Sequence, residues 1–264
     1  MLEKAKSLKN YTLRSIDGDI GKVEEFYFDD KHWTIRYLVA DLGDWLSERE
    51  VLVSPYSLGE VNSEERFIAV DLTKKQIEHS PSLGSHKPVS RQYEESYFQY
   101  YGWPTYWEGP YSWGMYPYIT RNHEKLINTG QPKKQWDSHL RSSRDMTGHH
   151  IQAKDGVIGH VDDFIVDDET WAVRYLVVDT KDWWPGKKVL ISTRWITRVD
   201  WIESKVYLDL TRAAVKKSPE YTETSLLSRS YEAGLHQHYD RTAYWVDEMS
   251  AQEDYLAASS AKGE

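Results

Sequence analysis

Alternation of apolar and polar residues predicts one long strand in each half of the chain. Residues 33–40 run Trp-Thr-Ile-Arg-Tyr-Leu-Val-Ala, and residues 171–178 run Trp-Ala-Val-Arg-Tyr-Leu-Val-Val. A period of two in β-branched and aromatic residues is typical of strands. Because both faces are partly apolar, we expect a central strand of a small closed or two-layer β structure. Shorter apolar runs predict further strands at 51–53, 67–70, 189–191 and 206–208.

Turn and cap residues predict where these strands and two short helices begin and end. Asp17-Gly18 is a turn signal, and Asp29-Asp30 is expected at the next turn. Thr73 and Gln76 form a capping box before a short helix, which Pro81 should end. Thr211 is the matching cap in the second half, where Ala214 lacks the reciprocal side chain.

The two halves of the chain match each other at an offset of 138 residues without a gap. Asp17-Gly18 falls on Asp155-Gly156, and Arg36-Tyr37-Leu38-Val39 falls on Arg174-Tyr175-Leu176-Val177. The match continues beyond the predicted strands, where Tyr106-Trp107 meets Tyr244-Trp245. About a third of the aligned positions are identical, so we interpret the chain as a two-copy duplication rather than a solenoid of many short repeats.

The ordered set of motifs in each copy resembles the PRC-barrel family. The set comprises Asp-Gly-x-Ile-Gly, Phe-x-x-Asp-Asp, Trp-x-[Ile/Val]-Arg-Tyr-Leu-Val-x-Asp, Val-Leu-[Val/Ile]-Ser and Asp-Leu-Thr-x-x-x-[Ile/Val]-x-x-Ser-Pro. This family includes the cytoplasmic domain of the photosynthetic reaction centre H subunit and the ribosome maturation factor RimM. The resemblance implies small β-barrels that bind other proteins or stabilise an assembly, with no catalytic residues to carry over.

The resemblance and the repeat together predict a mainly β protein with two small PRC-type β-barrels. Each barrel is expected to be followed by a short helix and an aromatic-rich segment. The expected organisation is repeat 1 at 8–85, an aromatic-rich linker at 86–145, repeat 2 at 146–223 and a partly helical tail at 224–264.

Composition narrows the classes of partner. The 264 residues are 39% hydrophobic and 28% charged, as in soluble globular proteins. A net charge of −9 argues against a nucleic-acid partner, because phosphate binding needs a basic face. The chain has no cysteine, which excludes disulfides, zinc–thiolate sites and a cysteine nucleophile. No signal peptide and no run of about 20 apolar residues is visible, so we expect a cytoplasmic protein that does not insert into a membrane.

Aromatic residues are the unusual part of the composition, with 12 Trp and 19 Tyr against 5 Phe. They gather at 93–118 and, more thinly, at 231–245, and Trp residues also stand in two loops. Such side chains suit contact surfaces, but they could equally pack against their own barrel or close a barrel end. The candidate interaction surface comprises Trp45, Trp103, Tyr106, Trp107, Trp113, Trp183, Trp184, Tyr244 and Trp245.

The polar clusters do not indicate a metal site or a catalytic site. His149, His150 and His160, or His236 and His238, show no recognised metal-ligand spacing. Arg36 and Arg174 fall in mid-strand, and buried arginines usually pair with a carboxylate, for which Asp41, Asp179 or a glutamate on a neighbouring strand are candidates. We therefore expect no catalytic residue, no cofactor and no metal.

The favoured hypothesis is a non-catalytic protein-interaction or scaffolding module, with a homo-oligomer as one option. One alternative is an assembly factor at the membrane surface, similar to the reaction centre H subunit. Another is a carbohydrate or small-ligand binding module that uses the Trp/Tyr surface. An enzyme is the weakest option.

Overall fold

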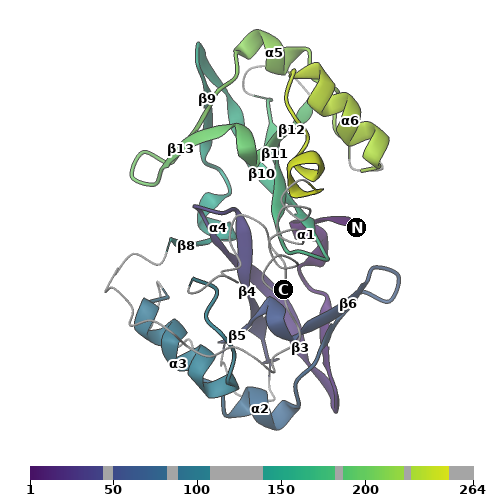
Figure 1. Cartoon of the computed structure of the whole chain (residues 1–264), viewed down its shortest axis with the longest axis vertical. Helices are drawn as coiled ribbons and strands as arrows, with labels where there is room; N and C mark the ends of the chain where they lie inside the picture. Colours follow the sequence, from purple (N-terminus) through teal and green to yellow (C-terminus); the bar gives the residue numbers. More distant parts are fainter. Residues whose placement is uncertain (44–49, 82–88, 108–138, 182–186, 223–226, 250–264) are drawn as a thin grey trace, which may run out of the picture. The chain divides into compact units, whose positions relative to one another are not determined.

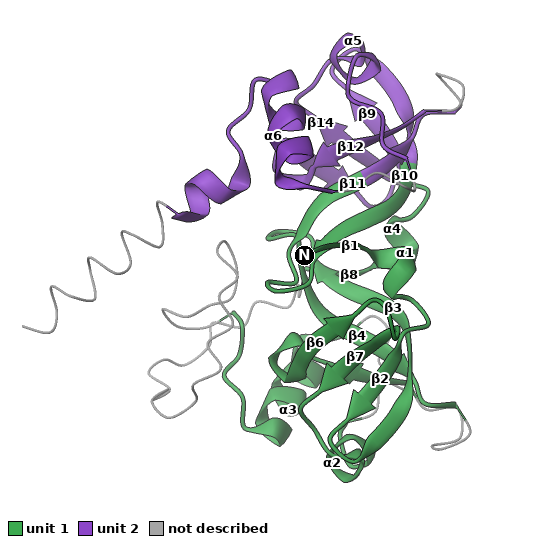
Figure 2. Ribbon diagram, turned by 90° about the vertical axis from the view of Figure 1, so that its right-hand side faces the viewer, with its two compact units in different colours: residues 1–149, 161–176 green, residues 150–160, 177–264 purple. Residues whose placement is uncertain are grey.

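The computed structural model describes residues 1–43, 50–81, 89–107, 139–181, 187–222 and 227–249. These residues form two compact units (Figure 2). The first unit comprises residues 1–149 and 161–176, and the second comprises 150–160 and 177–264. The boundary between the units therefore does not fall at the boundary between the two sequence repeats.

The strands form two seven-stranded sheets, each built mainly from one repeat, so the prediction of a mainly β fold is confirmed (Figure 1). The first sheet has the order β5-β4-β3-β2-β7-β6, with β8 paired to β3. Strands β2 and β7 are parallel, whereas the other recorded pairs in this sheet are antiparallel. The strands are β2 (Thr12–Ser15), β3 (Gly18–Asp29), β4 (Thr34–Asp41), β5 (Glu50–Val53), β6 (Leu58–Asn62), β7 (Phe67–Val70) and β8 (Leu140–Ser142).

The second sheet repeats this plan at the 138-residue offset, with the order β12-β11-β10-β9-β14-β13 and with β1 paired to β10. The predicted strands at 51–53, 67–70, 189–191 and 206–208 are all present, whereas β1, β6, β8 and β13 were not predicted. The strands are β1 (Leu2–Lys4), β9 (His150–Ala153), β10 (Gly156–Asp167), β11 (Val173–Asp179), β12 (Lys188–Ser192), β13 (Ile196–Asp200) and β14 (Lys205–Leu208).

Short helices follow each sheet, as predicted. The Thr73 hydroxyl accepts from the Gln76 backbone N–H, and the Gln76 side chain accepts from the Thr73 N–H, which confirms the capping box. Thr211 caps the matching helix without the reciprocal bond. The helices are α1 (Ala5–Leu8), α2 (Lys74–Glu78), α3 (Arg91–Tyr101), α4 (Ser143–Met146), α5 (Arg212–Lys216) and α6 (Arg229–His238).

The first strand of each repeat pairs with the long strand of the other repeat. Strand β1 joins β10, with Leu2 opposite Asp167, and β8 joins β3, with Leu140 opposite Asp29. All residues in this reciprocal exchange belong to the first compact unit, as do α1 and α4, which follow the exchanged strands (Figure 2). The chain thereby satisfies backbone groups along β3 and β10 that would otherwise form exposed strand edges.

The predicted central strand, β4, is buried on both faces. Seven of its eight residues are buried, including Arg36, and only Asp41 is exposed. Tyr37 and Leu38 point to opposite faces, because successive side chains of a strand alternate, yet both are fully inaccessible. The apolar residues on both faces thus correspond to a strand with no solvent-facing side.

A glycine at the same position of each repeat lets two strands approach closely. Gly21 has φ +149° and Gly159 has φ +145°, values that other residues rarely adopt. A Cβ at Gly21 would overlap the carbonyl oxygen of Asp41, and a Cβ at Gly159 would overlap that of Asp179. Close packing of the two strands therefore explains the glycine of the Ile-Gly motif in each copy.

We predict that Gly21→Ala lowers the free energy of unfolding by about 3 kcal/mol or more, because it adds backbone strain to a clash with a fixed carbonyl. Gly234→Ala is the matched control. It lies within α6, and no atom lies near its added Cβ. There alanine should raise stability by up to about 1 kcal/mol. Urea unfolding of both variants measures the difference, and equal midpoints would contradict the prediction.

Candidate functional site

The aromatic segment of repeat 1 begins with an ordered helix, α3, which sequence analysis placed in the linker. Ser90 caps it by accepting from the Tyr93 N–H, and Gly102 ends it in the left-handed conformation at φ 68°. The buried face of the helix consists of Tyr93, Glu94, Tyr97 and Phe98. The spacing of i, i+1, i+4 and i+5 puts all four on one side of the helix, so three of the five aromatic residues of α3 pack internally.

Tyr97 ties α3 to the edge strand β5. Its hydroxyl donates to the Leu52 carbonyl at 3.1 Å and accepts from the Ser54 N–H at 3.0 Å. Its ring meets that of Tyr37 edge-on, with centroids 5.4 Å apart. Because the ring is fully inaccessible, its polar tip needs both hydrogen bonds, and these fix the position of the helix on the sheet.

Glu94 is a buried acid at the centre of this packing. Its Oε1 accepts from the Tyr37 hydroxyl at 3.0 Å and from the Tyr106 hydroxyl at 2.7 Å. Its Oε2 lies 3.1 Å from the guanidinium of Arg91. Burial raises the pKa of Glu94 to about 7, against the opposing effects of Arg91 and of the two tyrosine hydroxyls. Glu94 thereby joins α3 to β4 and to the segment that follows the helix.

A second buried charge lies beside this cluster. The Arg36 guanidinium bonds the Asp29 carboxylate at 2.9 Å and stacks over the Tyr106 ring at 4.1 Å from its centroid. Burial alone would raise the pKa of Asp29, but the hydrogen bond from His32 and the charge of Arg36 hold it well below its usual range. Repeat 2 has the same pair, Arg174 with Asp167, at 2.7 Å.

The predicted partners of these arginines are therefore wrong in both copies. Asp41 accepts instead from the Gly43 N–H, and Asp179 pairs with Lys181. The partners are the aspartates expected in turns, because Asp29 ends β3 directly opposite Thr34 at the start of β4. A carboxylate at the end of a hairpin strand can thus reach back to a side chain two residues further along its partner.

The second repeat has its own version of the helix cluster, within the second compact unit. Tyr244 donates to Glu232 at 2.9 Å, and Arg229 stacks over Trp245 as Arg91 stacks over Trp107. His236 takes the place of Phe98 and contacts the rings of Trp195 and Trp245. Burial lowers the pKa of His236, which favours its neutral form. This histidine is packed among aromatic rings, and the described residues contain no group of His, Asp or Glu suited to hold a metal.

The predicted interaction surface divides into buried, half-buried and undescribed residues. Tyr106 and Tyr244 are only 3% and 5% exposed, so they are corrected from surface to core residues that hydrogen-bond Glu94 and Glu232. Trp103, Trp107 and Trp245 are half-buried. Trp45, Trp113, Trp183 and Trp184 lie outside the described residues.

Two neighbouring tyrosines that sequence analysis did not select join Trp103 on the outside of α3. Tyr100 is 41% exposed, and its ring meets Tyr101 edge-on at 4.8 Å. Tyr101 stacks on Trp103 at 4.4 Å with an interplanar angle of 11°. We call these three residues the outer aromatic row. The helical period could have identified Tyr100 as exposed, because it lies outside the buried positions 93, 94, 97 and 98.

The outer aromatic row is specific to repeat 1. At the offset of 138, Tyr100 corresponds to His238 and Trp103 to Arg241. Arg241 pairs with Asp209 of its own unit at 2.7 Å, and Tyr239, the counterpart of Tyr101, is buried. The Tyr–Glu hydrogen bond and the Arg–Trp stack are thus common to both repeats. The outer aromatic row has diverged, as have Tyr97 and Phe98 on the buried face, which correspond to Leu235 and His236.

Comparison with known families settles the nature of the repeats. The family model for the PRC-barrel domain matches residues 2–77 and residues 143–215, which together exceed half of the chain. The chain belongs to the PRC-barrel domain family. The two matched segments begin in β1 and at the start of α4, so each begins before the expected boundary, at 8 and at 146 respectively. A search of curated proteins gives no match to this PRC-barrel chain.

None of the described helices is both long enough and apolar enough to cross a bilayer.

We predict that Asp29→Asn costs about 3 kcal/mol of unfolding free energy at neutral pH, because it leaves the inaccessible Arg36 without its counter-charge. The folded-state pKa of Asp29 is lowered, so its stabilisation is present above about pH 4 and is lost as the pH falls further. The difference between wild type and variant should shrink in that acidic range. Asp19→Asn, in a solvent-exposed pair with Arg14, should change stability by less than about 0.5 kcal/mol. Chemical denaturation across pH checks both.

We further predict that Glu94→Gln gains stability relative to wild type as the pH rises. The folded-state pKa of Glu94 is raised, so the carboxyl's favourable contribution is complete below about pH 4.5 and is lost as the pH rises through about 7. By about pH 8 the variant should gain on the order of 1–3 kcal/mol relative to wild type. Glu95→Gln, on the exposed side of α3, is the control. Unfolding free energies that differ by a constant amount at every pH would refute the prediction.

Proposed function

We propose that this PRC-barrel protein is a non-catalytic adaptor that holds a protein partner on the outer aromatic row of repeat 1. The observation that carries the proposal is the difference between the two copies. The position two residues after α3 bears Trp103 in repeat 1, and the equivalent position in repeat 2 bears an ion-paired arginine, although the same tyrosine-to-glutamate hydrogen bond lies in the core of both copies. Exposed aromatic side chains on a rigid support are typical of interface anchors.

The support beneath the row favours binding without rearrangement. Tyr101 and Trp103 also contact the Tyr97 ring, which is fixed by its two hydrogen bonds to the chain around β5. The Tyr100 hydroxyl donates to the Gln76 carbonyl at 2.8 Å, which ties the row to α2. Side chains that are already ordered lose little conformational entropy when a partner binds.

The use of the buried ionisable groups supports an adaptor rather than an enzyme. Asp29 and Glu94, whose pKa values are strongly shifted, contact arginines, tyrosines and a histidine of their own barrel. Strongly shifted groups indicate catalysis when they line a cleft, but these two fix strands and a helix to one another. Contacts within the barrel therefore explain the shifted pKa values of both groups.

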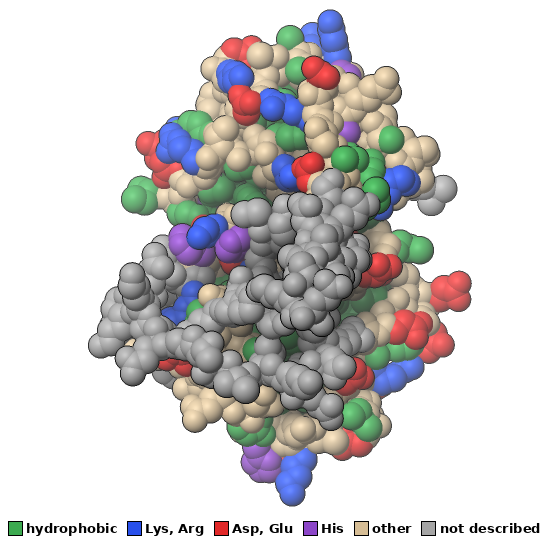
Figure 3. Space-filling model, viewed as in Figure 1, with side chains coloured by type: hydrophobic (Ala, Val, Ile, Leu, Met, Phe, Trp, Pro, Cys, Tyr) green, Lys and Arg blue, Asp and Glu red, His purple; other side chains and the backbone are tan. Residues whose placement is uncertain are grey.

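A protein is the class of partner that the surface suits best. Acidic and basic side chains both occur over the described residues on the face drawn in Figure 3, and the net charge of −9 opposes phosphate binding. Tyr101 and Trp103 stack on each other, so one ring face of each is already covered. A sugar platform would need those faces open, whereas a protein side chain can pack against ring edges and the Tyr100 ring.

The test is photocrosslinking in the protein's native cells, with a benzophenone amino acid at position 100. We expect one crosslinked protein that is lost when Trp103→Ala is added, since loss of an aromatic anchor costs about 2 kcal/mol or roughly thirtyfold in affinity. His238→Ala with Arg241→Ala, at the equivalent sites of repeat 2, should leave the crosslink intact. A crosslink to a second copy of the chain would identify the partner as a homo-oligomer.

The proposal fails if Trp103→Ala leaves the set of crosslinked proteins unchanged. It also fails if the tryptophan fluorescence of the purified protein responds to a panel of sugars through Trp103, which would establish the carbohydrate alternative instead.

A further inference from the structure

Asp209 in repeat 2 is held by two cations of its own barrel. The Lys154 ammonium lies 2.5 Å from its Oδ1, and the Arg241 guanidinium lies 2.7 Å from its Oδ2. At the offset of 138 the counterpart in repeat 1 is Asp71, which directly follows β7 and is exposed. Among the residues that the structure describes, neither an ion pair nor a hydrogen bond holds the Asp71 carboxylate. The charge of this acid is therefore balanced in one copy and not in the other.

Two differences between the copies account for this contrast. Lys154 corresponds to Ile16 in repeat 1, and Arg241 corresponds to Trp103. Ile16 is 70% exposed, and Trp103 belongs to the outer aromatic row. Repeat 1 thus keeps the acid but has apolar side chains at the two positions from which repeat 2 supplies its cations.

The backbone at all three positions is fixed by the same hydrogen bonds in both copies. In repeat 1 the N–H groups of Ile16, Asp71 and Trp103 donate to the carbonyls of Leu72, Ser57 and Phe98 at 2.7–3.0 Å. In repeat 2 the N–H groups of Lys154, Asp209 and Arg241 donate to those of Leu210, Trp195 and His236 at 2.9–3.1 Å. Ile16 and Trp103 therefore start from the same places around Asp71 as the two cations do around Asp209.

The outer aromatic row is also joined directly to the segment that holds Asp71. The Trp103 ring contacts the ring of Tyr56 at 5.9 Å between centroids, and Ser57, the next residue, accepts the Asp71 N–H. The Tyr100 hydroxyl bonds the Gln76 carbonyl, just as the His238 ring bonds the equivalent Ala214 carbonyl in repeat 2. The row and the acid thus belong to one surface of the first unit.

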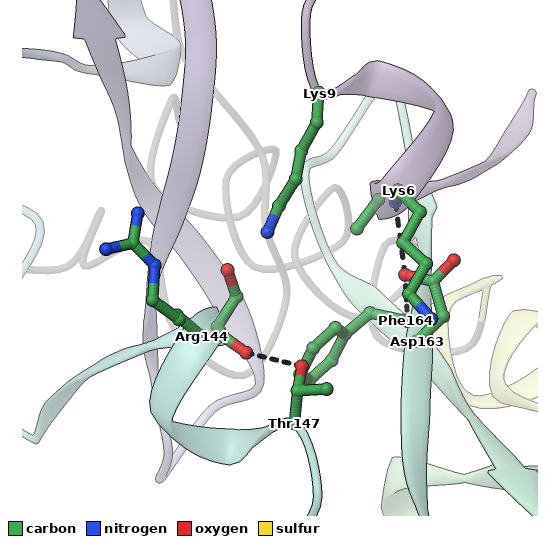
Figure 4. A pocket seen from close by; sticks show the side chains of 8 residues that line it. Lys6, Lys9, Arg144, Thr147, Asp163 and Phe164 are labelled. Atoms are coloured by element: carbon green, nitrogen blue, oxygen red, sulfur yellow. Dashed lines mark hydrogen bonds between the residues drawn. The ribbon is translucent and has the colours of Figure 1, made fainter.

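The charged side chains around the cavity between α1 and α4 differ from Asp71 in this respect (Figure 4). Lys6 pairs with Asp162, and Arg144 pairs with Glu24, both at 2.7 Å. Asp163 accepts two backbone N–H groups through its Oδ1. These groups are used by the fold itself, whereas the described part of the chain gives Asp71 no such use.

Resting on the function proposed above, we propose that the partner protein presents an arginine side chain to Asp71, beside the outer aromatic row. Neither oxygen of this carboxylate has a donor among the described residues, and a planar guanidinium bonds two carboxylate oxygens in parallel. The aliphatic stem of the arginine packs against Ile16 and Trp103. The net charge of −9 also favours a basic partner.

The carboxylate and the aromatic rings have separate tasks in this site. A solvent-exposed ion pair alone contributes little, because water competes for both charges. Aromatic rings beside the pair exclude part of that water and strengthen the attraction. The row therefore supplies contact area, and Asp71 selects arginine over an uncharged side chain of the same shape.

The test uses two peptides, acetyl-Ala-Leu-Arg-Leu-Ala-amide and its twin in which citrulline, the neutral isostere, replaces arginine. Each is titrated into the full chain while the Trp103 indole resonance and the Ile16 and Asp71 amide resonances are followed. We expect the arginine peptide to bind roughly fivefold or more tightly at low salt. The difference should shrink as the salt concentration rises, because the pair is exposed.

Variants assign the preference to Asp71. Asp71→Asn removes the charge, so both peptides should bind with the affinity of the citrulline peptide. Ile16→Lys leaves the aromatic row intact but supplies a cation from the chain itself, as Lys154 does in repeat 2, and should have the same effect. Glu64→Gln is the matched control, because it removes an exposed charge in the turn between β6 and β7 and should keep the wild-type preference. Amide spectra establish that each variant is folded.

Crosslinking from position 100 in native cells separates the failure of this inference from the failure of the proposed function. Asp71→Asn and Ile16→Lys should each lower the yield of the Trp103-dependent crosslink severalfold. If no crosslink depends on Trp103, the proposed function itself is wrong. If a Trp103-dependent crosslink keeps its full yield in both variants, the adaptor role stands and the arginine contact is refuted.

Two results with the peptides would also overturn the inference. One is equal affinity of the wild-type chain for the arginine and citrulline peptides. The other is equal affinity for the peptide and for free acetylarginine amide, which would assign the site to a small cationic ligand instead of a protein side chain.

Discussion

The reciprocal pairing of β1 with β10 and of β8 with β3 is the constraint on which the first compact unit depends. Each pairing joins residues about 110 to 165 positions apart in the sequence, so the loop-closure entropy is large and the pairs form only together with the apolar residues behind them. Leu8 and Met146, which follow the exchanged strands at equivalent positions, are both fully inaccessible. The exchange also explains why the boundary between the compact units differs from the boundary between the sequence repeats. Residues 161–176 belong to repeat 2 in sequence, but their contacts place them in the unit that contains repeat 1.

Sequence patterns predicted the parts of this fold that are decided locally. The alternation in β4 and β11, the Asp-Gly turns and the Thr73 capping box all depend on neighbours within a few residues, and all are present. The three-residue strands β1 and β8 carry no such signal, because a strand of that length acquires its identity from a distant partner. The same holds for Arg36: its environment predicted a carboxylate partner, but the choice between Asp29 and Asp41 depends on hairpin register, which composition does not encode.

The sequence predicted an aromatic segment at the candidate site, but it did not predict which of the rings are buried. The aromatic excess at 93–107 indicated an organised segment, and the structure divides it between rings that pack inward and rings that face outward. Helical phase decides this division: Tyr97 and Phe98 lie on the buried side of α3, whereas Tyr100 follows on the exposed side. Tyr106 is buried for a different reason: its hydroxyl is one of the two that donate hydrogen bonds to the buried Glu94 carboxyl. Without knowledge that Glu94 is buried, no sequence rule would have separated Tyr106 from Trp107.

Divergence between the copies is informative because the two repeats share one strand order and the same buried ion pair. Where both repeats keep a feature, as in Arg36–Asp29 and Arg174–Asp167, a structural role is sufficient to explain it. Where they differ at an exposed position, the scaffold does not require the residue in either copy. Trp103 against Arg241 is a difference of this kind. The outer aromatic row contacts the Tyr97 ring, and the counterpart of Tyr97 in repeat 2 is the buried Leu235, so the divergence at the surface extends to the side chain that supports it.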